Sequence, residues 1–225
     1  METDSADERR EALVELYREV RACRACPLGE TATNAVFGAG NSDADLMFVG
    51  EAPGAEEDRQ GLPFVGRAGK LLDQLLEEVG LVRDNVFITN VLKHRPPGNR
   101  DPEPDEISAC KPYLFKQIQL IEPRVICTLG NFATKLLTRS NRGIMSVHGR
   151  PQVHELAGRW VRLYPLCHPA AALRTPATLT ALREDFAGLP SLLQEPLPEP
   201  PGRPPPAAGG GDPVAAAPPQ MDLFG

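Results

Sequence analysis

The stretch DLMFVGEAPG, residues 45–54, joins a short apolar run to a tight turn rich in Gly and Pro. An apolar run of this length bounded by turn residues is typical of a strand that is buried on both faces. Three later runs have the same character, and the four predicted strands are 45–49, 86–91, 124–129 and 161–166. We therefore expect these four strands to form a buried, mainly parallel sheet.

Helical segments separate the predicted strands. An amphipathic helix is predicted over 6–22, and further helices over 68–79, 104–121, 131–137 and 176–193. Asp105 is expected to cap the helix over 104–121. Strands that alternate with helices indicate a three-layer α/β/α sandwich, here with a central sheet of four strands. Such folds carry their sites beyond the carboxyl ends of the strands, where four segments lie: 50–58, 90–100, 130–131 and 168–174.

Length and composition set the class of protein. A chain of 225 residues, 41% of them hydrophobic, is large enough for one α/β domain and a tail. No apolar run approaches the roughly 18 residues of a membrane span, and no apolar segment follows the polar start METDSADERR. We therefore expect a cytoplasmic protein with no membrane association. Five cysteines favour metal binding or burial in a reducing compartment over a disulfide scaffold.

The composition changes abruptly near residue 195. Ten prolines and a Gly-Gly-Gly run fall within residues 196–219, with almost no side chain to bury. The sequence therefore predicts a folded domain over 1–194 and a disordered, partly polyproline linker over 195–219. Apolar residues return in QMDLFG, residues 220–225, which we interpret as a separate short peptide.

The charge is unevenly distributed. The net charge is −6, yet residues 135–174 contain seven Lys or Arg residues and one acidic residue, Glu155. A local charge of +6 suits a nucleic-acid surface, but scattered arginines are equally typical of a solvated face. Charge alone leaves both interpretations open.

Four residues form a candidate set of metal ligands. Cys23 and Cys26 form a C-x2-C pair, and His94 and Cys110 follow, sixteen residues apart. Thiolates with one imidazole bind tetrahedral zinc or an iron–sulfur cluster, and the ligand types alone favour zinc. The two other cysteines, Cys127 and Cys167, lie within or at the end of predicted strands and are expected to be buried core residues.

Three separated motifs carry a family resemblance. They are GEAPGAEEDRQGLPFVGRAG at 50–69, ITNVLKHRPPGNRDPEPDE at 88–106 and HPAAALR at 168–174. In this order and spacing they resemble the family 4 uracil-DNA glycosylases, and the resemblance covers most of residues 10–190. It implies an enzyme that hydrolyses the N-glycosidic bond of deoxyuridine in DNA. The products would be free uracil and an abasic site, and this reaction would initiate base excision repair. A monofunctional, monomeric enzyme associated with the nucleoid is expected.

The resemblance also implies a cofactor. The family holds a [4Fe–4S] cluster on four cysteines, and the positions carried over are Cys23, Cys26 and Cys110, with His94 where the family has cysteine. Imidazole replaces thiolate in some clusters and raises their potential. Zinc remains the alternative. A related branch that crosslinks itself to DNA also has Lys-His here, but its basic insertion K-R-R-I-H is absent between Pro96 and Arg100. We therefore expect an enzyme that turns over its substrate rather than one that crosslinks itself to DNA.

Three pocket residues follow from the same resemblance. Phe64 matches the aromatic residue that stacks on uracil. Asn90 matches the residue that binds the base edge, where an amide offers both a donor and an acceptor and so favours uracil over cytosine. His168 matches the residue whose neutral imidazole donates to uracil O2 as negative charge develops there.

The turn after the first predicted strand supplies further candidates. Its backbone N–H groups can face an anion, and its expected substrate contacts are Gly50, Ala52 and Gly54. Family 1 enzymes have an aspartate where this turn has Ala52, so another carboxylate must activate water. The candidates are Glu51, Glu57 and Asp58. Carboxylates that merely cap a helix would give the same pattern, and we favour Glu51.

Two loops are expected to contact DNA. Arg95, Asn99 and Arg100 lie in the proline-rich loop. The segment after His168 corresponds to the loop that wedges into the minor groove in this superfamily. Its usual bulky position holds Ala172, so the wedge is assigned to Leu173, with Arg174 reaching a phosphate.

The last peptide has its own resemblance. Residues 220–224 resemble the pattern Q-L-[SD]-L-F of bacterial peptides that bind the sliding clamp, with Met221 in place of the first Leu. The matching residues assigned to clamp binding are Gln220, Leu223 and Phe224. A flexible linker would allow the clamp and the lesion to be bound together, which raises the effective concentration of the enzyme at its substrate.

Overall fold

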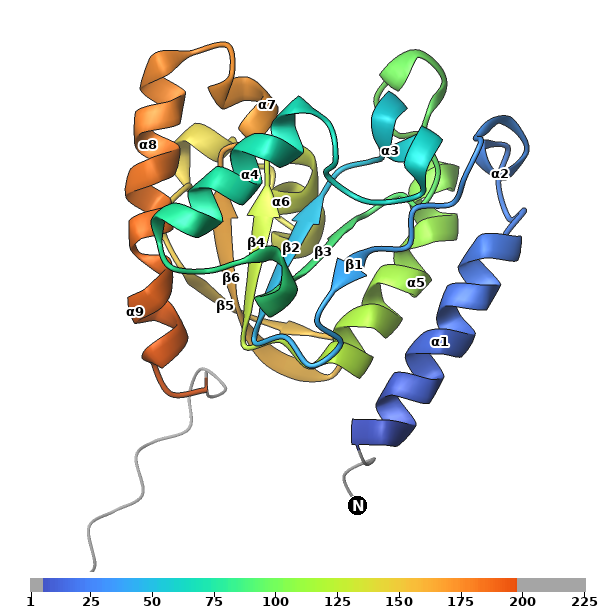
Figure 1. Cartoon of the computed structure of the whole chain (residues 1–225), viewed down its shortest axis with the longest axis horizontal. Coiled ribbons are helices and arrows are strands. Elements are labelled where there is room, and N and C mark those ends of the chain that lie inside the picture. Colours follow the sequence, from blue (N-terminus) through green and yellow to red (C-terminus); the bar gives the residue numbers. More distant parts are fainter. Residues whose placement is uncertain (1–5, 198–225) are drawn as a thin grey trace, which may run out of the picture.

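The computed structural model describes residues 6–197, which form a sheet with helices on both faces (Figure 1). The linker beyond residue 197 and the peptide over 220–225 lie outside the described residues. The strands are ordered β1-β3-β2-β4-β6-β5. Their bounds are β1 Ala39–Gly40, β2 Leu46–Gly50, β3 Phe87–Asn90, β4 Val125–Leu129, β5 Gln152–Leu156 and β6 Arg159–Leu166.

The predicted strands correspond to β2, β3, β4 and β6, which pair in parallel at the centre of the sheet. The predicted count of four is wrong, because two antiparallel edge strands, β1 and β5, extend the described sheet to six. β1 has only two residues, and β5 alternates between half-exposed and exposed positions before its buried last residue. Neither strand has the continuous apolar run that marks a strand buried on both faces.

Helices cover both faces of the sheet, as the sandwich prediction requires. The bounds are α1 Ala6–Ala22, α2 Leu28–Thr31, α3 Ala55–Gln60, α4 Arg67–Glu78, α5 Pro104–Ile121, α6 Asn131–Thr138, α7 Pro169–Ala172, α8 Pro176–Ala187 and α9 Leu189–Gln194. Successive side chains of β2 point to opposite faces. Leu46 and Phe48 belong to the core under α4, α8 and α9, whereas Met47 and Val49 belong to the core under α1, α5 and α6. The three-layer α/β/α sandwich is therefore confirmed.

Two helix boundaries differ from the prediction. Glu103, not Asp105, is the N-cap of α5, and its backbone N–H donates to the Glu106 carboxylate at 2.8 Å. The segment predicted as one helix over 176–193 is divided into α8 and α9 at Gly188. Pro190 lies in the first turn of α9, where its missing N–H is tolerated; within a continuous helix it would remove a hydrogen bond. No helix in residues 6–197 combines the length and the apolar character needed to cross a membrane.

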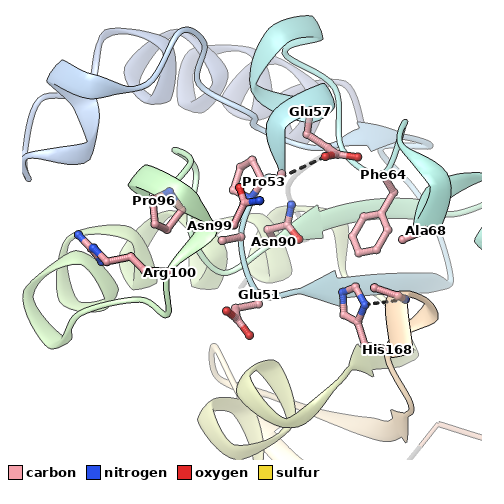
Figure 2. A pocket seen from close by; sticks show the side chains of 13 residues that line it. Glu51, Pro53, Glu57, Phe64, Ala68, Asn90, Pro96, Asn99, Arg100 and His168 are labelled. Atoms are coloured by element: carbon pink, nitrogen blue, oxygen red, sulfur yellow. Dashed lines mark hydrogen bonds between the residues drawn. The ribbon is translucent and has the colours of Figure 1, made fainter. Parts of the chain in front are cut away.

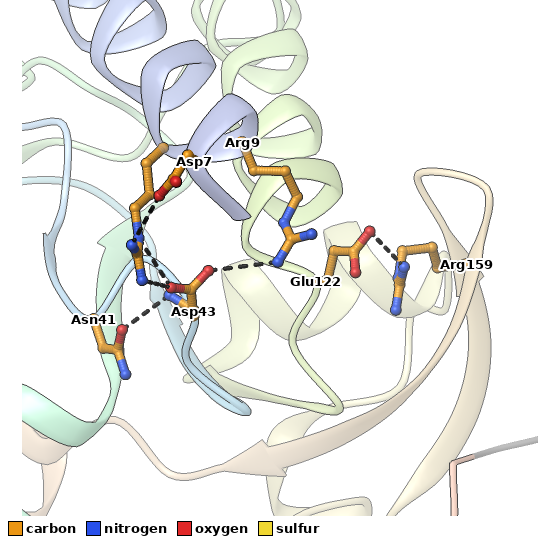
Figure 3. A network of polar contacts seen from close by, with 7 residues as sticks. Asp7, Arg9, Asn41, Asp43, Glu122 and Arg159 are labelled. Carbon is orange, nitrogen blue, oxygen red and sulfur yellow. Dashed lines mark hydrogen bonds and ion pairs between the residues drawn. The ribbon is translucent and has the colours of Figure 1, made fainter. Parts of the chain in front are cut away.

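Ion pairs gather at the amino ends of the strands. Figure 3 shows Asp43, in the loop before β2, bound to Arg9 of α1, and Glu122, after α5, paired with Arg159 at the start of β6. At this same end Arg162 pairs with Glu195 at 3.0 Å and donates to the Pro196 carbonyl oxygen at 2.6 Å. Glu195 and Pro196, which follow α9, are thus held at the amino ends of the strands.

Candidate active site

A cavity of about 370 Å³ lies at the carboxyl ends of the parallel strands. Its lining includes nine residues that the sequence singled out: Glu51, Ala52, Gly54, Glu57, Phe64, Asn90, Asn99, Arg100 and His168. The remaining lining residues were not singled out individually: Pro53, Ala68, Pro96 and Ala170. All four lie within the three quoted motifs, so the motifs themselves were the available signal. The structure thus brings three motifs from distant parts of the chain to one place.

The planar side chains face one another inside this cavity (Figure 2). Phe64 and His168 are stacked with their ring centroids 5.8 Å apart and an angle of 29° between the planes. Asn90, at the end of β3, is 2% exposed, and its Oδ1 atom has no hydrogen-bond partner among the described residues. A buried acceptor without a partner is costly. The cavity therefore has an apolar ring face beside an acceptor that a ligand N–H could satisfy.

Gly50 lets these groups come together. Its register partner across β2 and β3 is Asn90. A Cβ atom at Gly50 would lie 2.3 Å from Asn90 Oδ1 and 2.7 Å from Phe64 Cζ. Gly50 does not line the cavity, but only a residue without a side chain leaves room for both neighbours.

His168 is fixed in one tautomer. As the N-cap of α7, its Nδ1 atom accepts a hydrogen bond from the Ala170 backbone N–H at 3.1 Å. The proton of the neutral ring must therefore reside on Nε2. Burial lowers the pKa of His168 from 6.5 to about 4, although the Glu57 carboxylate partly opposes this shift. At neutral pH the ring is an uncharged donor.

The three candidate carboxylates have different surroundings. Glu51 is half-buried in the cavity, and its carboxylate accepts no hydrogen bond from the described residues. Burial together with the Asp101 carboxylate raises its pKa. Glu57 also lines the cavity, but its oxygens accept from the backbone N–H groups of Gly54, Val65 and Gly66 at 3.1, 2.9 and 2.9 Å. The Glu57 carboxylate thus ties the start of α3 to the Phe64 segment, and Glu51 keeps its oxygens available.

Asp58 lies outside the cavity. It is 7% exposed, and one carboxylate oxygen accepts from the backbone N–H groups of Thr33 and Asn34 at 2.8 and 3.2 Å. These contacts anchor the loop after α2 to α3. The structure therefore places Asp58 in a supporting position rather than beside Glu51.

The predicted DNA-contacting residues fall into two groups. In the proline-rich loop, Arg95 donates to Asn99 at 2.7 Å, and Arg100 binds the buried carboxylate of Glu106 at 2.9 Å. These two arginines help to fix the loop. After α7, Leu173 is 41% exposed and Arg174 is also exposed.

Ala172, at the usual wedge position, is only 3% exposed. The exposed apolar side chain is therefore displaced by one residue, to Leu173.

A second group of reactive side chains lies away from the cavity. Cys23 and Cys26 follow α1, His94 follows β3, and Cys110 is on α5, which packs against α1. Cys23, Cys110 and His94 are buried, Cys26 is half-buried, and the Nδ1 atom of His94 is buried without a hydrogen-bond partner in the described chain. In residues 6–197 no three His, Cys, Asp or Glu side chains converge as the ligands of one metal ion. Cys127 and Cys167 are buried.

Comparison with known proteins agrees with this geometry. The family model of the uracil DNA glycosylase superfamily matches residues 37–187. The chain is 50% identical over 173 residues to the type-4 uracil-DNA glycosylase of Saccharolobus solfataricus, covering 75% of this chain and 80% of that protein. For the type-4 enzyme of Sulfurisphaera tokodaii the identity is 47% over 191 residues, covering 83% and 87%. For that of Thermotoga maritima it is 47% over 167 residues, covering 73% and 85%.

The chain therefore belongs to the uracil-DNA glycosylase superfamily. Relatives that cover most of its length at this level of identity are type-4 uracil-DNA glycosylases. Within the superfamily, the chain groups with these type-4 enzymes.

The partly buried surroundings of the His168 ring lead to a pH prediction. Because folding lowers its pKa from 6.5 to about 4, the unfolded chain takes up a proton at a higher pH than the folded chain does. The stabilising contribution is therefore complete above about pH 6.5 and is lost as the pH falls towards 4. Long-range ¹H–¹⁵N NMR spectra should show the His168 ring neutral, with its proton on Nε2, from pH 8 to pH 5. A ring that titrates near pH 6.5 would contradict this environment.

Proposed function

We propose that this chain hydrolyses the N-glycosidic bond of deoxyuridine in DNA and releases free uracil. The observation that carries the proposal is the buried, unpaired Oδ1 atom of Asn90 in a cavity that Phe64 and His168 also line. Uracil offers an N3–H donor for that oxygen, whereas cytosine has an acceptor at N3. The type-4 relatives, which carry the name uracil-DNA glycosylase, support the same activity.

The cavity residues have different roles in the reaction. Phe64 stacks on a base that has been flipped out of the helix. As the bond between C1′ and N1 breaks, its electron pair moves into the uracil ring, and the Nε2–H group of His168 donates to O2 where charge collects. Glu51 accepts a proton from water while the water oxygen bonds to C1′. The products are an abasic deoxyribose and the uracil anion, which becomes free uracil when it takes up the proton that Glu51 gained from water.

The surroundings of the lysines favour hydrolysis without strand cleavage. A lyase step needs an amine that can attack C1′, and no residue that lines the described cavity is a lysine. Lys93 is close in sequence to Asn90 but is fully buried, and its Nζ atom donates to Thr89 Oγ1, the Asn90 carbonyl oxygen and Gln117 Oε1 at 2.7–2.8 Å. The chain also lacks the basic insertion that the self-crosslinking branch carries.

One assay separates the candidate activities. The protein is incubated with an oligonucleotide that contains one deoxyuridine, and the products are separated on denaturing gels with and without alkali. Strand cleavage only after alkali supports a monofunctional glycosylase. Cleavage without alkali would indicate lyase activity, a slow-migrating species would indicate a covalent trap, and intact DNA would refute the glycosylase proposal.

The ligand set described above suits a soft metal group, and the resemblance to the family 4 enzymes favours an iron–sulfur cluster over a zinc ion. The donors are soft, and the His94 nitrogen lacks a partner. The Lys93 backbone N–H, 3.4 Å from Cys110 Sγ, suits a thiolate.

We therefore assign Cys23, Cys26, His94 and Cys110 as ligands of a [4Fe–4S] cluster. The cluster would crosslink the end of α1 to α5 and the loop after β3, so its contribution is structural.

The cofactor assignment predicts a coloured protein. Anaerobically purified protein should be brown, with about four iron atoms and four acid-labile sulfides per chain. Cys110→Ala should lose the visible absorbance, whereas His94→Cys should keep it and lower the reduction potential, because thiolate adds negative charge. Colourless protein with one equivalent of zinc would contradict the cluster.

We also propose that residues 220–225 bind a bacterial sliding clamp, through Gln220, Leu223 and Phe224. The support is the sequence pattern and its separation from the folded domain by the Pro-rich linker. Deletion of 220–225 should abolish clamp binding in surface plasmon resonance and leave excision from a short oligonucleotide unchanged. Clamp binding that survives the deletion would contradict the assignment.

A further inference from the structure

Phe64 has an unusual backbone conformation for an aromatic residue. Its φ angle is +50°, in the left-handed region that non-glycine residues rarely occupy. Such a conformation persists only where the surroundings determine it strongly. The surroundings of this segment therefore decide where the Phe64 ring lies in the cavity.

Two charged side chains hold the segment from opposite sides of the peptide backbone. Glu57 accepts from the N–H groups of Val65 and Gly66, as described above. Arg83, at the start of the short 3-10 helix η1 Arg83–Asn85, donates to the carbonyl oxygens of Pro63 and Phe64, the latter at 3.1 Å. Donors on one side and acceptors on the other leave the peptide units around Phe64 little freedom to rotate.

Arg83 is itself fixed. Its Nη1 atom pairs with Asp73 of α4 at 2.8 Å. The planar guanidinium presents donors in a rigid fork, so one side chain can bind two carbonyl groups and a carboxylate together. Close packing adds to this constraint, since a Cβ atom at Gly69 of α4 would lie only 1.8 Å from the Phe64 carbonyl oxygen.

Arg83 does not line the cavity, and its side chain is 27% exposed. We propose that Arg83 is a positioning residue for uracil excision, which holds the Phe64 ring in its stacking position through the Pro63 and Phe64 carbonyl groups. The inference rests on the proposed function, because it assumes that Phe64 stacks on the base. Because the Arg83 side chain is partly exposed, its truncation to alanine leaves no large void in the core.

The test is a double-mutant cycle on kcat/KM for a deoxyuridine oligonucleotide, measured well below the unfolding temperature of every variant. Arg83→Ala should lower kcat/KM by about 10- to 100-fold, because small misplacements of substrate-positioning groups have effects of this size. In a Phe64→Ala background the same substitution should cost less than about twofold, since residues that act through one another are not additive. Equal losses in both backgrounds, or no loss in the wild-type background, would overturn the proposal.

Three further variants separate positioning from folding. Arg83→Lys keeps the charge but not the fork, so we expect an intermediate loss; it also replaces Arg83→Ala in the cycle if that variant does not fold. Asp73→Asn should cost less than Arg83→Ala. Arg183→Ala is the matched control, because Arg183 pairs with Glu78 at the C-terminal end of α4, and it should leave kcat/KM unchanged.

Direct binding of free uracil, measured by isothermal titration calorimetry, provides a readout independent of turnover. Arg83→Ala should weaken uracil binding and Arg183→Ala should not. Unchanged uracil binding with Arg83→Ala would contradict a role in stacking. An inactive wild-type chain would instead refute the proposed function and leave the uracil-binding measurement as the test of Arg83.

Discussion

Replacement of both His168 and Asn90 by alanine is expected to reduce the single-turnover rate of uracil excision by at least about a thousandfold. The Nε2–H group of His168 meets charge that grows only as the glycosidic bond breaks, and Asn90 orients the base that leaves. Removing one preorganised donor of this kind typically costs about 100- to 1000-fold, and the second substitution also removes recognition of the base edge.

The measurement is a rapid-quench time course with enzyme in excess over a deoxyuridine oligonucleotide. His154→Ala is a suitable control, since His154 is on the edge strand β5 and bonds to Gln152 outside the cavity. Excision by the double variant at the wild-type rate would show that the leaving uracil is stabilised elsewhere.

Gly50→Ala is expected to produce the second large effect, a loss of about 100-fold in kcat/KM. The added methyl would contact Asn90 Oδ1 and Phe64 Cζ at distances far below van der Waals contact. Both groups belong to the buried end of the cavity, so they must move away from the positions that hold the base. Excision assays over a range of DNA concentrations would measure the loss.

Gly143→Ala provides a control for this substitution. Its added Cβ would lie 4.0 Å from the nearest atom, Asn131 Oδ1. We expect no more than a twofold effect there. If Gly50→Ala excised uracil as fast as the wild type, the close approach of β2 to Asn90 and Phe64 would have no role in binding the base.

Local sequence patterns were sufficient for the centre of the fold. The four parallel strands carry continuous apolar runs, because both of their faces are covered by helices. The edge strands have no such signal: β5 alternates in exposure, and β1 is two residues long. Their pairing depends on neighbouring strands rather than on their own composition, and this is why the predicted sheet was too small.

Cavity residues could be predicted from the sequence where their positions follow from the strand that precedes them. Asn90 and His168 follow strand ends, where an α/β fold places its sites. The sequence favoured Glu51 over Glu57 but could not show what separates them, because the difference lies in which backbone N–H groups fold back onto each carboxylate. The role inferred for Arg83 depends on contacts with residues nineteen and twenty positions away, and no periodicity or motif records such contacts.

Arg162 and Arg124 hold the last described residues at the amino ends of the strands, through Glu195 and Pro196. The residues that line the cavity lie at the other end of the same strands. The last described residues therefore lie on the side of the domain away from the flipped nucleotide. Whatever binds the later residues need not compete with DNA for the cavity.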